Sequence, residues 1–163
     1  MVREISAGGI VIQERDGECW VAAIELPPQK QVADPPQPGK KQAKPLLALP
    51  KGLVDPGEKP LATALREVFE ETGLTADVIT KLGDIKYIYA RTWADGERVF
   101  KIVSFYLMRY RSGRIDDITP EMRIEVERAL WIKLEDAARM LAYKGEKQMV
   151  RKAMQYLDEH PER

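Results

Sequence analysis

The stretch REVFEETG, residues 66–73, places three glutamates and one arginine in a segment with the periodicity of a helix. Glu67, Glu70 and Glu71 are spaced i, i+3 and i+4, so a helix carries all three on one face. Like charges at this spacing repel each other by roughly 0.2–0.5 kcal/mol per pair. The cluster is therefore either the solvated side of a surface helix or a set of ligands for a cation.

The segments around this stretch predict a strand, a loop and a helix in that order. The sequence LLALP, residues 46–50, is strand-like, and LPKGLVDPGE, residues 49–58, predicts a glycine-containing loop. A helix is expected over residues 59–73, ended by Gly73. Its apolar stripe is predicted to comprise Leu61, Leu65, Val68 and Phe69.

The order of loop and acidic helix favours the cation over the solvated face. Packing three carboxylates at one helix end is costly unless a positive charge neutralises them, and Mg²⁺ prefers such oxygen ligands together with substrate phosphates. Two or more such ions would bridge phosphate oxygens. Arg66 is placed to pair with a carboxylate across the loop, and Glu58 is the candidate partner.

These residues resemble the characteristic box of the Nudix family: Gly, five residues, Glu, seven residues, Arg-Glu, an aliphatic residue, any residue, Glu-Glu, any residue, Gly and an aliphatic residue. The resemblance implies an α/β fold, an α/β/α sandwich with a mixed β-sheet. It also implies hydrolysis of a nucleoside diphosphate linked to another moiety, with Mg²⁺ or Mn²⁺ as cofactor. The matching positions are Gly52, Glu58, Arg66, Glu67, Val68, Glu70, Glu71, Gly73 and Leu74.

The resemblance also implies a role for each charged position of the box. Glu67, Glu70 and Glu71 become metal-binding carboxylates, Glu67 or Glu71 also being a candidate to position or deprotonate water. The Gly52 carbonyl is a further candidate ligand, and Arg66 with Glu58 becomes a structural ion pair. Some members use a glutamate outside the box as base or extra ligand. The candidates here are Glu121, Glu125 and Glu127, of which Glu125 is favoured.

The remaining sequence predicts strands first and helices last. ISAGGIVIQ and CWVAAIEL are apolar runs separated by Asp16-Gly17, which predicts a hairpin, and a second hairpin is expected around Asp95-Gly96. RALWIKL is a further strand, and LEDAARMLAY and GEKQMVRKAMQYLDEH predict helices. This order indicates one domain over residues 1–163, with helices on both faces of the sheet.

Residues 27–45 form a proline- and lysine-rich segment with few apolar side chains. Such a segment does not bury enough surface to offset its ordering entropy, so we predict a long loop inserted within the domain. Two interpretations stay open: a lid or basic guide for the substrate, and a solvated insertion without a role.

Substrate specificity has to come from residues outside the box. Lys51, Lys101 and Lys144 are candidate phosphate-binding residues, because together they would neutralise a chain longer than two phosphates. Tyr87 and Tyr89, with Trp93, are candidates for stacking on a base, or else they simply pack on the sheet.

LPKG, RVFKIVSFYLM and LAYKGEK resemble the diadenosine polyphosphate hydrolase branch of the family and also the Nudix proteins that clear oxidised guanine nucleotides. The downstream proline of the ADP-ribose branch is missing between residues 85 and 95, which makes ADP-ribose a weaker candidate substrate. A Nudix-fold sensor that binds a nucleotide without cleaving it is the non-enzymatic alternative. The complete set of box glutamates favours the enzyme.

Composition limits the partners. The chain has 163 residues, of which 26 are basic and 26 acidic, so its formal net charge is zero. The overall charge therefore does not favour nucleic acid or an anionic membrane as the partner. No apolar run reaches the roughly 18 residues of a membrane helix. The single cysteine, Cys19, fits a reducing compartment, and we predict a cytoplasmic protein whose partner is a small nucleotide. A homodimer is a further expectation for this family.

Overall fold

The computed structural model describes residues 1–28, 45–92 and 94–161. Most of the predicted loop at 27–45 and the stacking candidate Trp93 lie outside these residues. One mixed sheet has the strand order β3-β2-β1-β6-β5, with β4 paired to β1 and β7 paired to β2. Strands β1 and β6 run parallel and the other pairs are antiparallel.

The elements follow the predicted order along the chain, except that the predicted loop at residues 49–58 contains a short strand, because residues 51–53 pair with β1. Their bounds are β1 Val2–Arg15, β2 Glu18–Leu26, β3 Leu46–Ala48, β4 Lys51–Leu53, α1 Pro60–Thr72, β5 Leu74–Ala90, β6 Arg98–Gly113, the 3-10 turn η2 Glu121–Ile124, β7 Arg128–Lys133, α2 Leu134–Met140 and α3 Lys144–Glu159.

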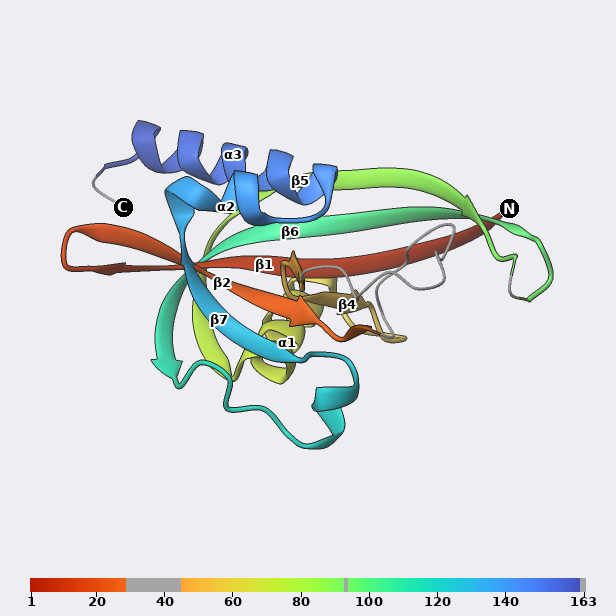
Figure 1. Ribbon diagram of the computed structural model, residues 1–163. Helices are drawn as coiled ribbons and strands as arrows, with labels where there is room; N and C mark the ends of the chain where they lie inside the picture. Colours follow the sequence, from red (N-terminus) through yellow and green to blue (C-terminus); the bar gives the residue numbers. More distant parts are fainter. Residues whose placement is uncertain (29–44, 93, 162–163) are drawn as a thin grey trace, which may run out of the picture.

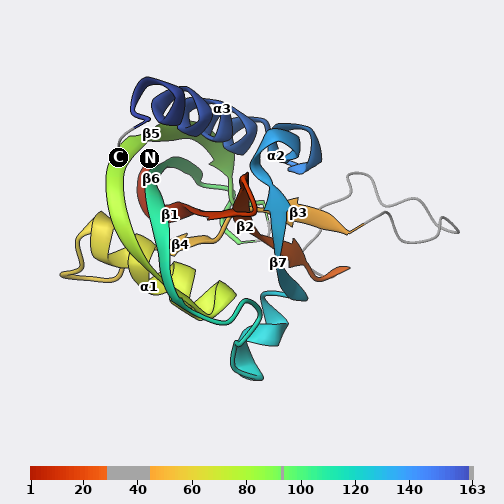
Figure 2. The same ribbon diagram turned by 90° about the vertical axis from the view of Figure 1, so that its left-hand side faces the viewer.

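Helices cover both faces of the sheet, which confirms the predicted α/β/α sandwich. Figures 1 and 2 show α2 and α3 together on one face and α1 on the other. Among the described residues, no helix combines the length and the apolar character that a membrane crossing requires. The organisation of residues 1–163 as one domain stays a prediction.

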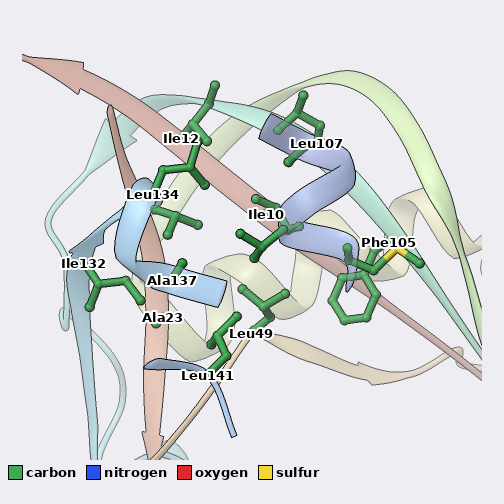
Figure 3. Packing of buried hydrophobic residues seen from close by; sticks show 14 of the residues in the cluster. Ile10, Ile12, Ala23, Leu49, Phe105, Leu107, Ile132, Leu134, Ala137 and Leu141 are labelled. Carbon is green, nitrogen blue, oxygen red and sulfur yellow. The ribbon is translucent and has the colours of Figure 1, made fainter. Parts of the chain in front are cut away.

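Strand β1 lies between the two helical layers, and its side chains alternate between them. Ile10 and Ile12 belong to the core beneath α2 and α3 (Figure 3), whereas Ala7 and Val11 pack with α1. This alternation is the period of two that a strand buried on both faces requires. Helix α1 lies very close to β1: a Cβ atom added to Gly9 would come within 2.8 Å of Val68 Cγ2. The absence of a side chain at Gly9 therefore permits this approach.

Both predicted hairpins form. Arg15 pairs with Glu18, and the two turn residues between them, Asp16 and Gly17, both have positive φ angles, 52° and 77°. That combination is the one a type I′ turn needs. The second hairpin joins β5 to β6, and its loop contains Gly96 at φ 71°.

The predicted apolar stripe of α1 is partly wrong. Val68 is buried and Leu65 is half-buried, but Leu61 and Phe69 are 38% and 57% exposed. The buried face instead runs through Ala64, Val68 and Glu71, because small side chains let α1 approach β1 closely and the helix turns one glutamate inward. The spacing of the apolar residues alone does not reveal that the helix is rotated in this way.

Candidate active site

Helix α1 and strand β4 bring the box residues together. The helix ends at Gly73, whose φ is 84° and whose amide donates to the Phe69 carbonyl at 2.9 Å, as predicted for a helix-ending glycine. Gly52 on β4 faces the helix, and a Cβ atom there would lie 2.2 Å from Glu67 Cδ. Only glycine lets the Glu67 carboxylate come this close to the strand.

Arg66 is the cation at the centre of the box. Its Nε and one terminal nitrogen donate to the two Glu58 carboxylate oxygens, both at 2.9 Å, so the predicted Arg66–Glu58 pair forms as a bidentate contact. The hydrogen bonds from Arg66, with a further one from Thr63 at 2.6 Å, lower the pKa of Glu58 to about 2. This pair fixes the loop before α1 against the helix.

The other terminal nitrogen of Arg66 contacts two of the three predicted metal-binding glutamates. It donates to Glu67 at 2.9 Å and to Glu70 at 3.3 Å. Both carboxylates are therefore turned toward the guanidinium. In the described part of the chain, no three acidic, histidine or cysteine side chains converge into a metal-coordinating group in this arrangement.

Glu71 differs from the other two because it points inward. It is 6% exposed and accepts a hydrogen bond of 2.8 Å from the Lys51 amide. Burial, followed by the charge of Glu67, raises the pKa of Glu71 to about 8. Burial also raises the pKa of Glu67. Carboxylates in such surroundings favour a proton or a cation beside them, and hard divalent ions suit this all-oxygen donor set.

The segment after β6 carries Glu125 to the same place. An ion pair of 2.7 Å between Arg123 and Asp116 holds the segment, and Asp116 also accepts from the Ala129 amide at 2.8 Å. Glu125 follows η2 and lies close to Glu67 and Glu71. Burial is the main cause of the raised pKa values of these two glutamates, and the charge of Glu125 makes a smaller contribution in the same direction.

These side chains line a cavity of about 540 Å³, here named the carboxylate cavity. The structure brings Glu121 and Glu125 to it, whereas Glu127 is not among the described residues that line it. The charged residues and candidate metal ligands that line it include Glu67, Glu70, Glu71, Glu125, Gly52, Lys51 and Lys101.

A second cavity of about 490 Å³, the aromatic cavity, adjoins the first through Lys51, which lines both. Tyr87 from β5 and Tyr143 before α3 line it, together with apolar side chains of the sheet. The Lys51 ammonium lies 2.6 Å from Glu146 and 5.4 Å from the centre of the Tyr143 ring. Burial acts to lower the pKa of Lys51, but the Glu146 carboxylate, together with the charge of Glu71, outweighs burial and the pKa is raised.

The structure separates the predicted substrate residues into two groups. Lys51, Lys101 and Tyr87 line the cavities, and Lys101 also pairs with Glu4 at 3.1 Å. Lys144, the first residue of α3, and Tyr89 are not among the described lining residues of either cavity. The Tyr89 hydroxyl instead donates to Glu4 at 2.9 Å.

Two residues of the site were missed as candidates from the sequence: Tyr143 and Glu146. They lie three positions apart in LAYKGEK, where the sequence indicated only Lys144. Glu146 is the third residue of α3, where a glutamate typically caps the start of its own helix. The neighbouring sequence therefore does not indicate that Glu146 is buried against Lys51.

Comparison with known proteins identifies the architecture. The NUDIX domain family model matches residues 3–153. The chain belongs to the Nudix hydrolase family. The box found in the sequence is therefore the Nudix box, and the fold around it is that of the family.

Individual relatives agree with this assignment. A Mycobacterium tuberculosis protein with the provisional name mutator protein MutT4 is 36% identical over 157 residues. The match covers 96% of this chain and 57% of that relative. The asymmetrical bis(5'-nucleosyl)-tetraphosphatase of Mus musculus is 31% identical over 118 residues, which cover 69% of this chain and 72% of the relative.

Solved structures show the same fold at lower identity. An Ap4A hydrolase of C. elegans in a binary complex superposes with a TM-score of 0.62 at 20% identity, covering 96% of this chain and 98% of that one. The Nudix domain of Shewanella oneidensis NrtR complexed with ADP-ribose gives 0.63 at 18% identity, covering 96% and 90%.

Proposed function

We propose that this Nudix chain is a divalent-metal-dependent hydrolase that cleaves a phosphoanhydride bond of a nucleotide, and that its substrate is a dinucleoside polyphosphate. The observation that carries the proposal is the pair of adjoining cavities that share Lys51. One cavity has aromatic and apolar walls suited to a nucleoside, and the other is lined by carboxylates suited to metal-bound phosphates.

The carboxylate cavity supplies the chemistry. Glu67, Glu70 and Glu71, with the Gly52 carbonyl, would hold Mg²⁺ or Mn²⁺, which supplies charge neutralisation of phosphate and a lowered pKa for bound water. Glu125 borders the same cavity and is the candidate to accept a proton from the attacking water. Arg66 holds the helix against the loop that precedes it, through its two hydrogen bonds to Glu58.

The aromatic cavity supplies recognition. Tyr87 and Tyr143 present ring surface on which a base can stack, and Val103 and Phe105 supply apolar wall. Lys51 lies between the two cavities, where a phosphate chain leaving the base would pass it. Lys101 adds positive charge in the carboxylate cavity. This arrangement supports a substrate with several phosphates after the nucleoside.

The relatives support two substrate classes. The mouse relative is named for action on bis(5'-nucleosyl) tetraphosphates, which favours a dinucleoside polyphosphate as substrate. The mycobacterial relative bears the name of a mutator protein, which favours an oxidised nucleoside triphosphate as the second candidate. The cytoplasmic location and the homodimer remain predictions from the sequence.

A substrate panel tests the proposed function. Diadenosine tetra-, penta- and hexaphosphate, ADP-ribose, NADH, dGTP and 8-oxo-dGTP are incubated with the protein and Mg²⁺, or with EDTA, and the products are resolved by chromatography. We expect EDTA-sensitive cleavage of the long dinucleotides, with ATP among the products. Preference for 8-oxo-dGTP would instead identify an oxidised nucleoside triphosphate as the substrate. Nucleotide binding without turnover of any compound would contradict the enzyme and favour a sensor.

Removing either ring of the aromatic cavity is expected to weaken substrate binding more than chemistry. Stacking of a base on an aromatic side chain contributes about 1–3 kcal/mol. We therefore expect Tyr143→Ala and Tyr87→Ala each to raise KM roughly 5- to 150-fold while kcat changes little. Steady-state kinetics on the best substrate of the panel measures both constants.

Tyr156→Ala is the control, because Tyr156 lies near the end of α3, stacks on His160 with 4.0 Å between ring centres, and is not among the described lining residues of either cavity. A KM close to that of the wild type is expected for this variant. If Tyr87→Ala and Tyr143→Ala raised KM no more than Tyr156→Ala did, the base would bind outside the aromatic cavity.

A further inference from the structure

Glu146 is a buried carboxylate that neither the Nudix box nor the sequence pattern singles out. It belongs to the first turn of α3 and is 2% exposed. One carboxylate oxygen accepts from the Leu49 amide at 2.7 Å, and the other contacts the Lys51 ammonium at 2.6 Å. The carboxylate thus holds two residues that are separated by one position, Leu49 between β3 and β4 and Lys51 at the start of β4.

The held segment is the one that contacts Glu71. The Lys51 side chain reaches Glu146, while the Lys51 amide donates to Glu71 at 2.8 Å. Between these two residues, the Pro50 carbonyl accepts from the Gly9 amide of β1 at 3.2 Å. Residues 49–51 are therefore fixed from α3 and from β1, and their orientation fixes the donor to the inward-pointing glutamate.

A glutamate at this helical position is often a cap that turns back to the start of its own helix. The hydrogen bonds of the Glu146 carboxylate instead reach across the fold, to residues 97 and 95 positions away in the sequence. A buried ion pair is commonly no more stable than a well-packed apolar pair. Stability is therefore a weak reason for a carboxylate here, whereas orientation of Lys51 is a specific one.

We propose that Glu146 is a positioning residue for the hydrolytic site. It orients the Lys51 amide toward Glu71 and keeps the Lys51 ammonium compensated where the two cavities meet. This inference rests on the proposed metal-dependent hydrolase, because it assigns Glu146 a role in organising the carboxylate cavity.

The first test is Glu146→Gln, which keeps an acceptor for the Leu49 amide and removes the charge opposite Lys51. Loss of a partner that orients metal ligands typically costs 10- to 100-fold. We expect Mn²⁺ affinity, followed by electron paramagnetic resonance of free Mn²⁺, to fall about 10-fold, and kcat to fall about 10- to 100-fold. Glu159→Gln, at the exposed end of the same helix, is the control and is expected to match the wild type.

The second test is a double-mutant cycle with Lys51→Met. If Glu146 acts by compensating and orienting Lys51, the double variant regains part of the Mn²⁺ affinity that Glu146→Gln loses. Glu146→Asp, which retains the charge with a shorter reach, is expected to fall between the wild type and Glu146→Gln. It also keeps the inference testable if the glutamine variant does not fold.

Two outcomes would overturn the inference: a folded Glu146→Gln variant with Mn²⁺ affinity and kcat within about twofold of the wild type, or strictly additive losses in the cycle. The Mn²⁺ titration does not depend on turnover. A wild-type protein that cleaves nothing in the panel would therefore contradict the proposed function while the titration still decides the role of Glu146.

Discussion

Replacing Glu71 by glutamine is expected to lower kcat roughly 1,000-fold, which corresponds to about 4 kcal/mol of lost transition-state stabilisation. The substitution removes a charged ligand from the centre of the carboxylate cavity but keeps the shape of the side chain. It also keeps an oxygen that can accept the Lys51 amide, which now lies 2.8 Å from Glu71. The loss should therefore arise from chemistry and metal binding, with the fold intact.

The same variant should change how stability depends on pH. Burial and the Glu67 charge raise the pKa of Glu71 from about 4.5 to about 8 in the folded protein. Between these two values the folded state retains a proton that the unfolded state has released. The free energy of unfolding therefore falls as pH rises through this interval, by at most about 1.4 kcal/mol per pH unit.

Thermal melts in EDTA at pH 6 and pH 8.5 measure this effect. The wild type should lose stability between the two conditions, and Glu71→Gln, which has no such proton to release, should lose less. Added Mg²⁺ should stabilise the wild type more than the variant, because a ligand stabilises only the state that binds it. An equal pH dependence in both proteins would show that Glu71 is not the titrating group.

Asp77→Asn is the control for loss of one carboxylate. Asp77 is exposed on β5, and its ion pair with the exposed Arg111 is long, at 3.6 Å. We expect wild-type kcat from it. A Glu71→Gln variant that kept kcat within about tenfold of the wild type would contradict the role given to Glu71.

The box and the hairpins could be predicted because their information is local. Glu67, Glu70 and Glu71 share a helical face through spacing alone, and Asp16-Gly17 specifies a tight turn whatever surrounds it. The Arg66–Glu58 pair spans only eight residues, within the reach of one loop and one helix. Such features follow from short stretches of sequence without knowledge of the sheet order.

The second half of the site depends on the sheet order and on α3. Lys101 faces Glu4 only because β1 and β6 pair in parallel, with these two residues in register. Glu146 meets Lys51 only because the fold brings the first turn of α3 beside residues 49–51. Sequence periodicity predicts that a helix buries one face, but it does not specify which residue 95 positions away lies beneath it.

The second large effect is expected from Gly73→Ala, which should lower the free energy of unfolding by about 2–5 kcal/mol. Gly73 has a φ of 84°, and an alanine in the left-handed region costs about 1–2 kcal/mol. A Cβ atom there would also lie 2.7 Å from the carbonyl oxygens of both Arg114 and Asp117. Relieving contacts with backbone atoms requires the chain to move, at a further cost of about 1–3 kcal/mol.

Gly57→Ala separates these two contributions, because Gly57 has a nearly identical φ of 80° but a Cβ atom there would meet nothing within 4 Å. Urea unfolding of both variants should show that Gly57→Ala carries only the conformational cost. Equal losses would mean that the contact with residues 114–117 is unimportant.

The Gly73 contact also has a consequence for catalysis. The end of α1 is joined to this segment by a hydrogen bond of 2.9 Å from the Asp116 amide to the Thr72 carbonyl, and the segment leads on to Glu125. Pushing the two apart should separate Glu125 from Glu71, so the folded fraction of Gly73→Ala should have a reduced kcat. A folded fraction with wild-type kcat would show that the docking of α1 on this segment serves stability alone.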